Sequence, residues 1–347
     1  MNTKPVNEEK VVNNIYNDIS ALIDDARRKV YYTANSEMLY IYWKIGEIIV
    51  RIQDGNERAS YGDNIINILS QMLAAKYGNG FSVENLRRMR KFYSTFPDYK
   101  LINLHLNWSH YLILLRINNE KKRNFYFNEC INSNWSVREL QRQINSLLYE
   151  RLISNANTDK ILQLAEKGHE IKETKDIIKD PLVLEFLDLK DNDKYHEYDL
   201  EKNILEHLKE FLLELGKGFT FVGSQVKITI GNDQFYPDLV FYNRILQCFV
   251  IFDLKIGKVT HQDIGQMQMY VNYYDREVKN ENENKTVGIL LCTNKNETVV
   301  KYTLPEDNAT IFAAEYMLHL PTEKELIKTI EDEKVYLETI NKKKFNL

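Results

Sequence analysis

The sequence has little of what builds cross-linked or membrane-embedded proteins. Its three cysteines lie far apart along 347 residues and form no CxxC pair, so neither a disulfide framework nor a paired-cysteine metal motif is expected. Cys248 and Cys292 lie in apolar runs, and we interpret them as buried free thiols of a cytoplasmic protein. No apolar run reaches about 18 residues, and the stretch MNTKPVNEEK lacks the apolar segment of a signal peptide. We therefore expect no membrane span.

Glycine and proline are also scarce, with 13 and 6 residues. This scarcity favours long helices over architectures built from tight turns. Hydrophobic residues make up 44% of the chain and charged residues 28%, which is typical of a globular protein and not of a disordered one. The length is sufficient for two domains of ordinary size.

Charge is distributed unevenly along the chain. The formal net charge of −4 is by itself a weak argument against binding a polyanion. Residues 1–160 hold 22 Lys and Arg against 17 Asp and Glu, net +5, whereas residues 161–347 hold 24 against 33, net −9. We therefore expect the N-terminal part to contact phosphate. The acidic second part suits a site of metal-binding carboxylates, although surface acids account for most of its charge.

The N-terminal part is predicted to be helical. Apolar residues recur at every third or fourth position over residues 11–50 and again over 65–73. Gly78-Asn79-Gly80 ends the second helix, and Ser82 is a suitable N-cap for a third. A helix, a glycine turn and a basic helix are typical of a helix-turn-helix, so we predict nucleic-acid binding here; the alternative is the solvated face of a core helix. The basic residues of the third helix are Arg87, Arg88, Arg90 and Lys91.

Another helix is predicted to begin at Ser136. Glu139 follows three residues later, which is the spacing of a capping box. Arg138 and Arg142 fall on the polar side of this helix, and we include them among the predicted nucleic-acid-binding residues. His110 has no cysteine, serine or metal ligand at a matching spacing, so we interpret it as a structural histidine.

Composition changes between the two parts of the chain. Residues 154–179 are polar and weakly periodic, which is typical of a linker that is partly helical at most. We predict a helical, nucleic-acid-binding domain over residues 1–155, a linker over 156–180 and a second domain over 181–347. The apolar segment after Asp180-Pro181 is expected to pack on the second domain.

The second domain is predicted to combine helices with a mixed sheet. A strongly amphipathic helix is expected over Asp199–Leu215, with Glu201 near its inward edge and Glu206 nearer its polar side. A charged helix is expected over residues 322–342. The predicted strands are Phe219–Val222, Gln225–Ile230, Phe235–Tyr242, Cys248–Lys255, Thr286–Cys292 and Ile311–Glu315.

Two acids and a lysine in this strand region form a candidate site. Asp253 and Lys255 are two residues apart on one strand and therefore share a face. Asp238 comes beside Asp253 only if the hairpin between their strands has a loop of about four residues, Arg244–Gln247. A two-residue turn at Asn243-Arg244 would displace the two acids by roughly 13 Å along the strands. The hypothesis that these three residues form one site therefore predicts how the two strands of this hairpin pair.

These residues resemble a known motif. Asp238 followed by Asp253-x-Lys255 looks like the motif of the PD-(D/E)XK nuclease superfamily, and Gln266-x-x-x-Tyr270 is similar to the QxxxY motif of its RecB-like branch. More closely, most of the chain resembles the YhcG family of bacterial PD-(D/E)XK proteins. The matching segments, which cover both domains, are YWKIGEII, YGNGFSVENLRRMRKFY, WSHY, WSVRELQRQI, DPLVLEFLDL, FLLELGKGF, and GSQ through GQMQMY. Asp253 departs from the family, which usually has Glu there; the superfamily accepts either acid.

The resemblance implies an α+β protein: an all-α N-terminal domain with a helix-turn-helix-like segment, then an α/β restriction-endonuclease-like domain whose mixed central sheet is flanked by helices. It also implies a nuclease that hydrolyses phosphodiester bonds in DNA with Mg²⁺ or Mn²⁺. Asp238, Asp253 and the Leu254 carbonyl would bind the metal ion. Lys255 would position the attacking water or stabilise charge on the phosphate.

The same resemblance suggests roles for the neighbouring residues. Glu201 is the acid that the family places on a helix, with Glu206 as the fallback. Gln266 and Tyr270, four residues apart on one helical face, would orient the site or touch the phosphate backbone. Dimers that cut two strands are common in the superfamily, so a homo-oligomer is also expected.

Other interpretations stay open at this point. Asp253 and Lys255 could form a surface ion pair at a strand edge, although the apolar run FVIF directly before them argues against exposure. The chain could also keep a nuclease fold without turnover and act as a nucleic-acid-binding or assembly protein, because fold does not establish activity. A purely structural helical adaptor would leave the two acids and the lysine unexplained.

Overall fold

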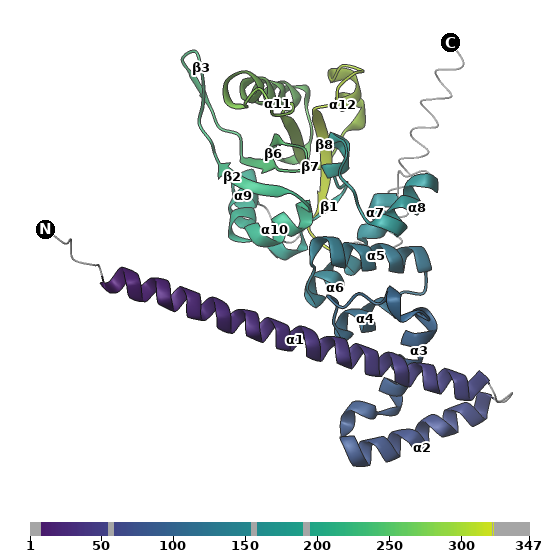
Figure 1. Ribbon diagram of the computed structural model, residues 1–347. Coiled ribbons are helices and arrows are strands. Elements are labelled where there is room, and N and C mark those ends of the chain that lie inside the picture. The colour runs from purple at the N-terminus through teal and green to yellow at the C-terminus, as the bar shows by residue number, and fades with distance from the viewer. Residues whose placement is uncertain (1–7, 55–58, 154–157, 190–194, 321, 323–347) are drawn as a thin grey trace, which may run out of the picture. The chain divides into compact units, whose positions relative to one another are not determined.

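The computed structural model describes residues 8–54, 59–153, 158–189, 195–320 and 322 (Figure 1). The chain divides into two compact units, Met1–Leu140 and Gln141–Leu347. Within the described ranges, no helix combines the length and apolarity that crossing a membrane requires.

The first unit consists of helices in its described residues, as predicted. The elements in chain order are α1 (Glu8–Asp54), α2 (Ala59–Tyr77), the 3₁₀ turn η1 (Asn79–Phe81), α3 (Val83–Thr95), the 3₁₀ turn η2 (Tyr99–Leu101), α4 (Trp108–Leu114) and α5 (Glu120–Ser133). The next helix, α6 (Val137–Asn145), begins in the first unit and ends in the second. The α2–η1–α3 segment is the predicted sequence of helix, glycine turn and basic helix.

Helix α1 is 47 residues long, and one glycine in it sets the packing of the unit. A Cβ atom at Gly46 would lie 2.2 Å from the Met89 carbonyl oxygen, so a larger residue would push α3 away from α1. The close approach buries Ile49 of α1 with Ile66 of α2 and with Leu86 and Met89 of α3. The buried residues of α3 are Leu86, Met89 and Phe92, and its basic residues lie on other faces.

The capping residues lie where the sequence places them. The Ser82 hydroxyl accepts a hydrogen bond from the Asn85 backbone N–H at the start of α3. Ser136 and Glu139 form the predicted capping box, with the Glu139 N–H donating to Ser136 Oγ at 3.3 Å and the Ser136 N–H donating to Glu139 Oε2 at 2.5 Å.

His110 is a structural residue, as interpreted from the sequence. Its Nε2 atom lies 3.0 Å from the Trp135 carbonyl oxygen, and its Nδ1 atom lies 3.0 Å from Asn107 Oδ1. Burial lowers the pKa of His110, so the ring is held neutral. It ties the start of α4 to the segment that follows α5.

The second unit is built on a mixed six-stranded sheet with the strand order β1-β8-β7-β6-β5-β2. Strands β6, β7, β8 and β1 run parallel, and β2, β5 and β6 pair antiparallel. A separate hairpin pairs β3 with β4. The strands are β1 (Leu182–Val183), β2 (Phe219–Ser224), β3 (Ile228–Ile230), β4 (Asp233–Phe235), β5 (Leu239–Asn243), β6 (Cys248–Lys258), β7 (Val287–Asn294) and β8 (Ile311–Met317).

Helices contribute to two hydrophobic clusters of this unit. One cluster joins Phe252 of β6 to Leu200 of α9 (Glu197–Glu206) and Phe211 of α10 (Leu208–Leu215). The other joins Ile251 of β6 to Met267 of α11 (His261–Tyr273), with residues of α12 (Glu297–Thr303) packed against it. Because neighbouring residues of a strand face opposite sides, the alternation along β6 fills both clusters and confirms the predicted fold class.

Several element limits differ from the sequence-based prediction. The helix predicted over Asp199–Leu215 is two helices, because His207 leaves the helical region with φ −112° and ψ 32°. The strand predicted over Gln225–Ile230 begins only at Ile228, and the one predicted from Phe235 is interrupted by Pro237, which has no N–H for a sheet hydrogen bond. The helix predicted over 322–342 lies outside the described residues, apart from residue 322.

The segment before the sheet carries helical structure. It includes α7 (Leu148–Ile153), α8 (Thr158–Lys167) and η3 (Thr174–Ile177), and η4 (Glu185–Leu187) follows the first strand, β1. Ile177 is 4% exposed and belongs to the α9–α10 cluster, as do Leu182, Leu184 and Leu187. The end of the predicted linker is therefore packed into the second unit, while the domain limits 1–155, 156–180 and 181–347 stay a prediction.

Candidate active site

The β5–β6 hairpin has the register that the site hypothesis requires. Leu239 pairs with Phe252 and Asn243 pairs with Cys248, and the loop between them is Arg244–Gln247. Continuing this register by one residue places Asp238 opposite Asp253. The prediction of the register from the two acids is therefore confirmed.

Asp238 directly precedes β5 and is held in place by three hydrogen bonds. Its Oδ2 atom accepts from the Leu254 backbone N–H at 2.7 Å. Its Oδ1 atom accepts from Gln225 Nε2 at 3.0 Å, and its carbonyl oxygen accepts from the Gln225 N–H at 3.0 Å. Burial raises the pKa of Asp238, although the Leu254 N–H and Lys255 oppose the shift. The carboxylate is held in place but is not charge-balanced.

Asp253 and Lys255 form an ion pair on β6. Lys255 Nζ lies 2.9 Å from Asp253 Oδ2 and 3.5 Å from Glu197 Oε2, so the ammonium is shared by two carboxylates. Burial and the neighbouring Asp238 raise the pKa of Asp253 to about 6 despite the lysine. Burial alone would lower the pKa of Lys255, but Asp253 and Glu197 outweigh it and raise the pKa. Lys255 is therefore firmly protonated, and the cluster carries excess negative charge.

Helix α9 directs two acids toward these strands. Glu197 and Glu201 are four residues apart and share a helical face. Glu197 Oε1 accepts a hydrogen bond from the Ile256 N–H at 3.2 Å, and Glu201 Oε2 accepts from Gln225 Nε2 at 2.7 Å. Glu201 is 7% exposed, and its pKa is raised by burial. Glu206 is exposed and lies 4.0 Å from Lys202, so the geometry favours Glu201 as the helix acid.

Gln266 and Tyr270 lie together on α11. Gln266 Nε2 donates to the Tyr270 hydroxyl at 2.5 Å. Tyr270 is 1% exposed and packs in the α11 cluster, and burial raises its pKa. The charges of Asp253 and Asp238 also raise the pKa of Tyr270, and Lys255 lowers it.

The oxygen atoms at this site fit a hard divalent cation. Among the described residues, no three His, Cys, Asp or Glu side chains come together as a complete metal cage. Mg²⁺ does not need one, since it is usually bound through one or two carboxylates and completes its shell with water and substrate phosphate. Asp253 Oδ2 is buried and, apart from its ion pair with Lys255, accepts no hydrogen bond from the described residues. Asp238, Asp253 and the Leu254 carbonyl are the groups that would hold the ion.

Known proteins share both parts of the sequence. Residues 175–331 match the model of the YhcG PDDEXK nuclease domain, and residues 18–151 match the model of the DUF1016 N-terminal domain. The Escherichia coli (strain K12) protein named "Putative nuclease YhcG" is 36% identical over 345 residues, which is 90% of this chain and 92% of that protein. This chain belongs to the YhcG family.

Two solved structures overlap part of this YhcG-family chain, each over 38% of its length. One is the crystal structure of a repair endonuclease from Pyrococcus abyssi, with 17% identity, a TM-score of 0.26 and 50% of that chain covered. The other is EndoMS in its apo form, with 16% identity, a TM-score of 0.25 and 49% of that chain covered. Overlaps this partial say nothing about the chemistry of this chain. The nuclease domain is established by the family match.

The basic residues predicted to bind nucleic acid do not share one environment. Arg87, Lys91 and Arg138 are exposed, and Arg90 is half-buried. Arg88 is half-buried and its Nε atom lies 3.1 Å from Glu84 Oε1, an ion pair between consecutive turns of α3. Arg87 and Lys91 are therefore the α3 residues of this set with exposed side chains.

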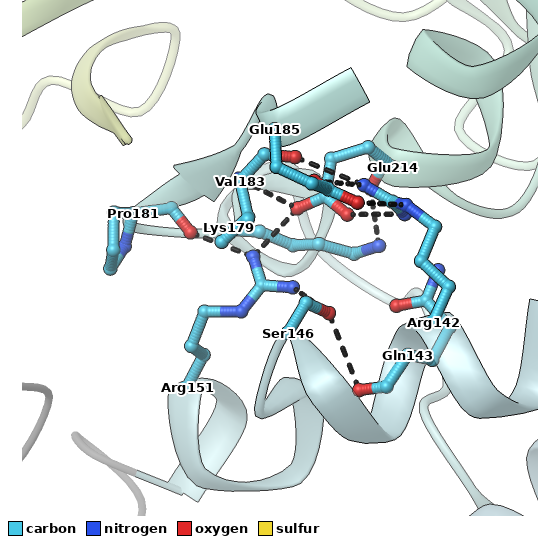
Figure 2. A network of polar contacts seen from close by, with 9 residues as sticks. All are labelled: Arg142, Gln143, Ser146, Arg151, Lys179, Pro181, Val183, Glu185 and Glu214. Atoms are coloured by element: carbon cyan, nitrogen blue, oxygen red, sulfur yellow. Dashed lines mark hydrogen bonds and ion pairs between the residues drawn. The ribbon is translucent and has the colours of Figure 1, made fainter. Parts of the chain in front are cut away.

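Arg142 is a correction to the predicted nucleic-acid-binding set. Its guanidinium lies inside the second unit, where it contacts Glu185 at 2.8 Å, Glu214 at 3.1 Å and the Val183 carbonyl at 3.0 Å (Figure 2). Figure 2 also shows Arg151, whose Nη1 atom lies 2.6 Å from Glu214 Oε1. A guanidinium with these partners has a structural role, so we remove Arg142 from the nucleic-acid-binding residues.

Sequence reasoning missed two residues that contact the candidate site in this structure. Glu197 shares Lys255 with Asp253, and its spacing of four from Glu201 is a signal that helical periodicity could have supplied. Gln225 connects Glu201 to Asp238, and nothing in its spacing indicates this contact. Its position was assigned to a strand, in which neighbouring side chains would point to opposite faces.

Proposed function

We propose that the second unit is a Mg²⁺- or Mn²⁺-dependent nuclease that hydrolyses phosphodiester bonds in DNA, and that the first unit binds the nucleic acid. The observation that carries the proposal is the hairpin register that sets Asp238 opposite Asp253, with Lys255 paired to Asp253 at 2.9 Å. Two carboxylates that can hold a metal ion, with a protonated lysine beside them, suit metal-assisted hydrolysis of a phosphodiester.

Different groups of the chain have different roles in the proposed reaction. Asp238 and Asp253 present carboxylate oxygens, and the Leu254 carbonyl adds a third oxygen. A bound Mg²⁺ would supply polarisation of the scissile phosphate and a lower pKa for an attacking water. Lys255 is held protonated and therefore stabilises the negative charge that develops on the phosphate oxygens. Tyr270 is held by its hydrogen bond from Gln266, and the two residues orient the site or contact the phosphate backbone of the nucleic acid.

Nucleic-acid binding by the first unit is supported by α3. Its buried stripe faces α1 and α2, while Arg87 and Lys91 remain exposed. Phosphate contacts of this kind release counterions, so affinity should fall steeply with salt. Replacing Arg87 and Lys91 together by alanine should weaken DNA binding at every sequence and reduce the salt dependence, as measured by fluorescence anisotropy across a salt series.

The first unit also supports assembly with a second copy of the chain. Val12, Ile15, Ile19 and Leu22 of α1 are between 51% and 71% exposed. Their heptad-like spacing forms a stripe that another copy of α1 matches with its own, as in a two-stranded coiled coil. Replacing Ile19 and Leu22 by glutamate should convert an oligomer to a monomer in light scattering after gel filtration. A wild-type monomer would contradict this role.

The deciding experiment is a cleavage assay with Mg²⁺ or Mn²⁺ on labelled duplex, single-stranded, flap and four-way-junction DNA, with RNA beside them. Wild type runs with Lys255→Ala and Asp238→Ala, and Lys258→Ala serves as the control because it removes an exposed lysine from the same strand. We expect cleavage to be lost in the two site variants and kept in the control. Binding without cleavage by the wild type, unchanged in both site variants, would favour an inactive nucleic-acid-binding protein instead.

A further inference from the structure

Gln225 lies between two acids that come from different elements. Its Nε2 atom is 2.7 Å from Glu201 Oε2 on α9 and 3.0 Å from Asp238 Oδ1 beside β5. Its backbone N–H also donates to the Asp238 carbonyl oxygen at 3.0 Å. An amide group has two N–H donors, so one side chain connects the helix acid to the strand acid while the main chain of the same residue holds the strand acid in place.

The backbone of Gln225 has a conformation that its side chain does not favour. Its φ of +46° lies in the left-handed region, where a residue with a Cβ atom is strained and glycine is not. The residue directly follows β2, after the irregularity in pairing between Phe221 and Gly223. Gln225 is exposed, so burial does not compensate for the strain. The hydrogen bonds to Glu201 and Asp238 are therefore what a glutamine provides at this position in return for the strain.

The chemistry of an amide suits this position. Lysine or arginine between Glu201 and Asp238 would neutralise them and compete with a cation for the same oxygens. A neutral amide satisfies one oxygen of each carboxylate and leaves their negative charge in place. The two acids are thereby kept at a fixed separation although they repel one another.

We propose that Gln225 is a positioning residue that holds Glu201 and Asp238 in the arrangement needed to bind a divalent cation. This inference rests on the proposed nuclease function, because it assigns Gln225 a part in that same site. It predicts that losing the amide weakens cation binding more than it affects folding. If Gln225 had a structural role alone, losing the amide would affect folding more than cation binding.

The chain offers a matched control in Gln247. This residue is also an exposed glutamine with a left-handed backbone, at φ +50°, but it belongs to the loop at the other end of the β5–β6 hairpin. Methionine has nearly the length of glutamine and lacks the amide, whereas glycine removes the side chain and relieves the backbone. Gln225→Met and Gln225→Gly are therefore compared with Gln247→Met and Gln247→Gly in the full-length protein.

Mn²⁺ affinity is measured by titration calorimetry without nucleic acid, and melting temperature is measured on the same samples without metal. We expect both Gln225 variants to bind Mn²⁺ roughly tenfold or more weakly than wild type, and both Gln247 variants to bind like wild type. The two glycine variants should have similar melting temperatures, because they relieve the same backbone strain.

Two results would overturn the inference. One is wild-type Mn²⁺ affinity and wild-type cleavage in Gln225→Met. The other is a melting temperature of Gln225→Gly far below that of Gln247→Gly with affinity unchanged, which would assign the glutamine to folding alone. Either result leaves the proposed nuclease intact as long as Asp238→Ala abolishes cleavage. If wild type neither binds Mn²⁺ nor cleaves, the proposed function fails, and the positioning role fails with it.

Discussion

Glu214 and Asp253 are both buried carboxylates of the second unit, 0% and 3% exposed, but the charges around them differ. Glu214 faces Arg151, Lys179 and Arg142; burial alone would raise its pKa, yet these cations together lower it to about 2 (Figure 2). Asp253 shares the single ammonium of Lys255 with Glu197, and burial with Asp238 raises its pKa to about 6.

The difference separates structural charge from functional charge. A carboxylate surrounded by enough cations and donors is already stabilised, and it has no further need of a ligand. A carboxylate left under-compensated is unfavourable until a cation arrives, which is the arrangement found at functional sites. By this criterion we assign the network around Glu214 to folding, and we propose that the cluster around Asp253 serves activity.

The largest effect is expected from a substitution that disrupts the ion pairs around Glu214. Glu214→Gln should lower the free energy of unfolding by about 3–5 kcal/mol, because Arg151, whose side chain is 1% exposed, and Arg142, 17% exposed, lose the carboxylate that they share. Urea denaturation gives the value. The control is Glu170→Gln, whose ion pair with Lys172 is exposed to water, and it should leave the unfolding midpoint unchanged. Equal midpoints for the two variants would contradict the comparison.

The two clusters should respond to pH with opposite signs. The pKa of Glu214 is depressed from 4.5 to about 2, so its stabilisation is present above pH 4.5 and is lost as pH falls toward 2. The pKa of Asp253 is raised from 3.8 to about 6, so its stabilisation is present below pH 3.8 and is lost as pH rises through 6. Each group changes the unfolding free energy by at most about 1.4 kcal/mol per pH unit.

Urea midpoints between pH 2.5 and 7 in a chelator test this prediction. Glu214→Gln should flatten the acid side of the profile, and Asp253→Asn should flatten the decline toward pH 6. A wild-type profile that Asp253→Asn leaves unaltered would show that Asp253 is not under-compensated.

A smaller effect concerns the stability of the metal-free protein at neutral pH. Asp253→Asn should raise its free energy of unfolding by about 1 kcal/mol, because it removes a buried negative charge beside Asp238. The same variant should lose cleavage and the stabilisation that added Mn²⁺ gives to wild type. Thermal unfolding with and without Mn²⁺ measures both. A destabilised variant would place Asp253 with Glu214 as a structural residue.

The smallest effect is expected at Glu197, which is 45% exposed and is the second partner of Lys255. Glu197→Gln should reduce cleavage by roughly threefold to tenfold, since Lys255 keeps its closer partner and loses only part of its orientation. Single-turnover rates at saturating Mn²⁺ measure the change. A loss as large as that of Lys255→Ala would mean that Glu197 itself contacts the reacting groups.

The sequence was sufficient for the parts of the site that lie on regular elements. Strand alternation put Asp253 and Lys255 on one face, and the need to bring Asp238 beside them predicted the Arg244–Gln247 loop. Helical periodicity predicted α3 and its Ser82 cap. These features depend on local geometry, which repeats along an element and can therefore be counted from the sequence.

The remaining features depend on contacts between distant residues. Arg142 meets Glu214 across 72 positions, and on sequence alone its place on the polar side of a helix indicated exposure. Gln225 is linked to Asp238 because the chain leaves the strand conformation after Ser224 and adopts a positive φ, which its residue type does not favour. Neither contact has a period or a spacing that sequence analysis could detect.

The two arginines of Figure 2 also decide where this protein can be divided. A fragment that starts at residue 156, where the predicted linker begins, would lack Arg142 and Arg151 and leave Glu214 with Lys179 as its remaining cation. Its sheet would be complete, but a deeply buried carboxylate would be largely unpaired. The shortest self-sufficient nuclease fragment should therefore start at Ser136, ahead of α6, about twenty residues upstream of the limit that composition suggests.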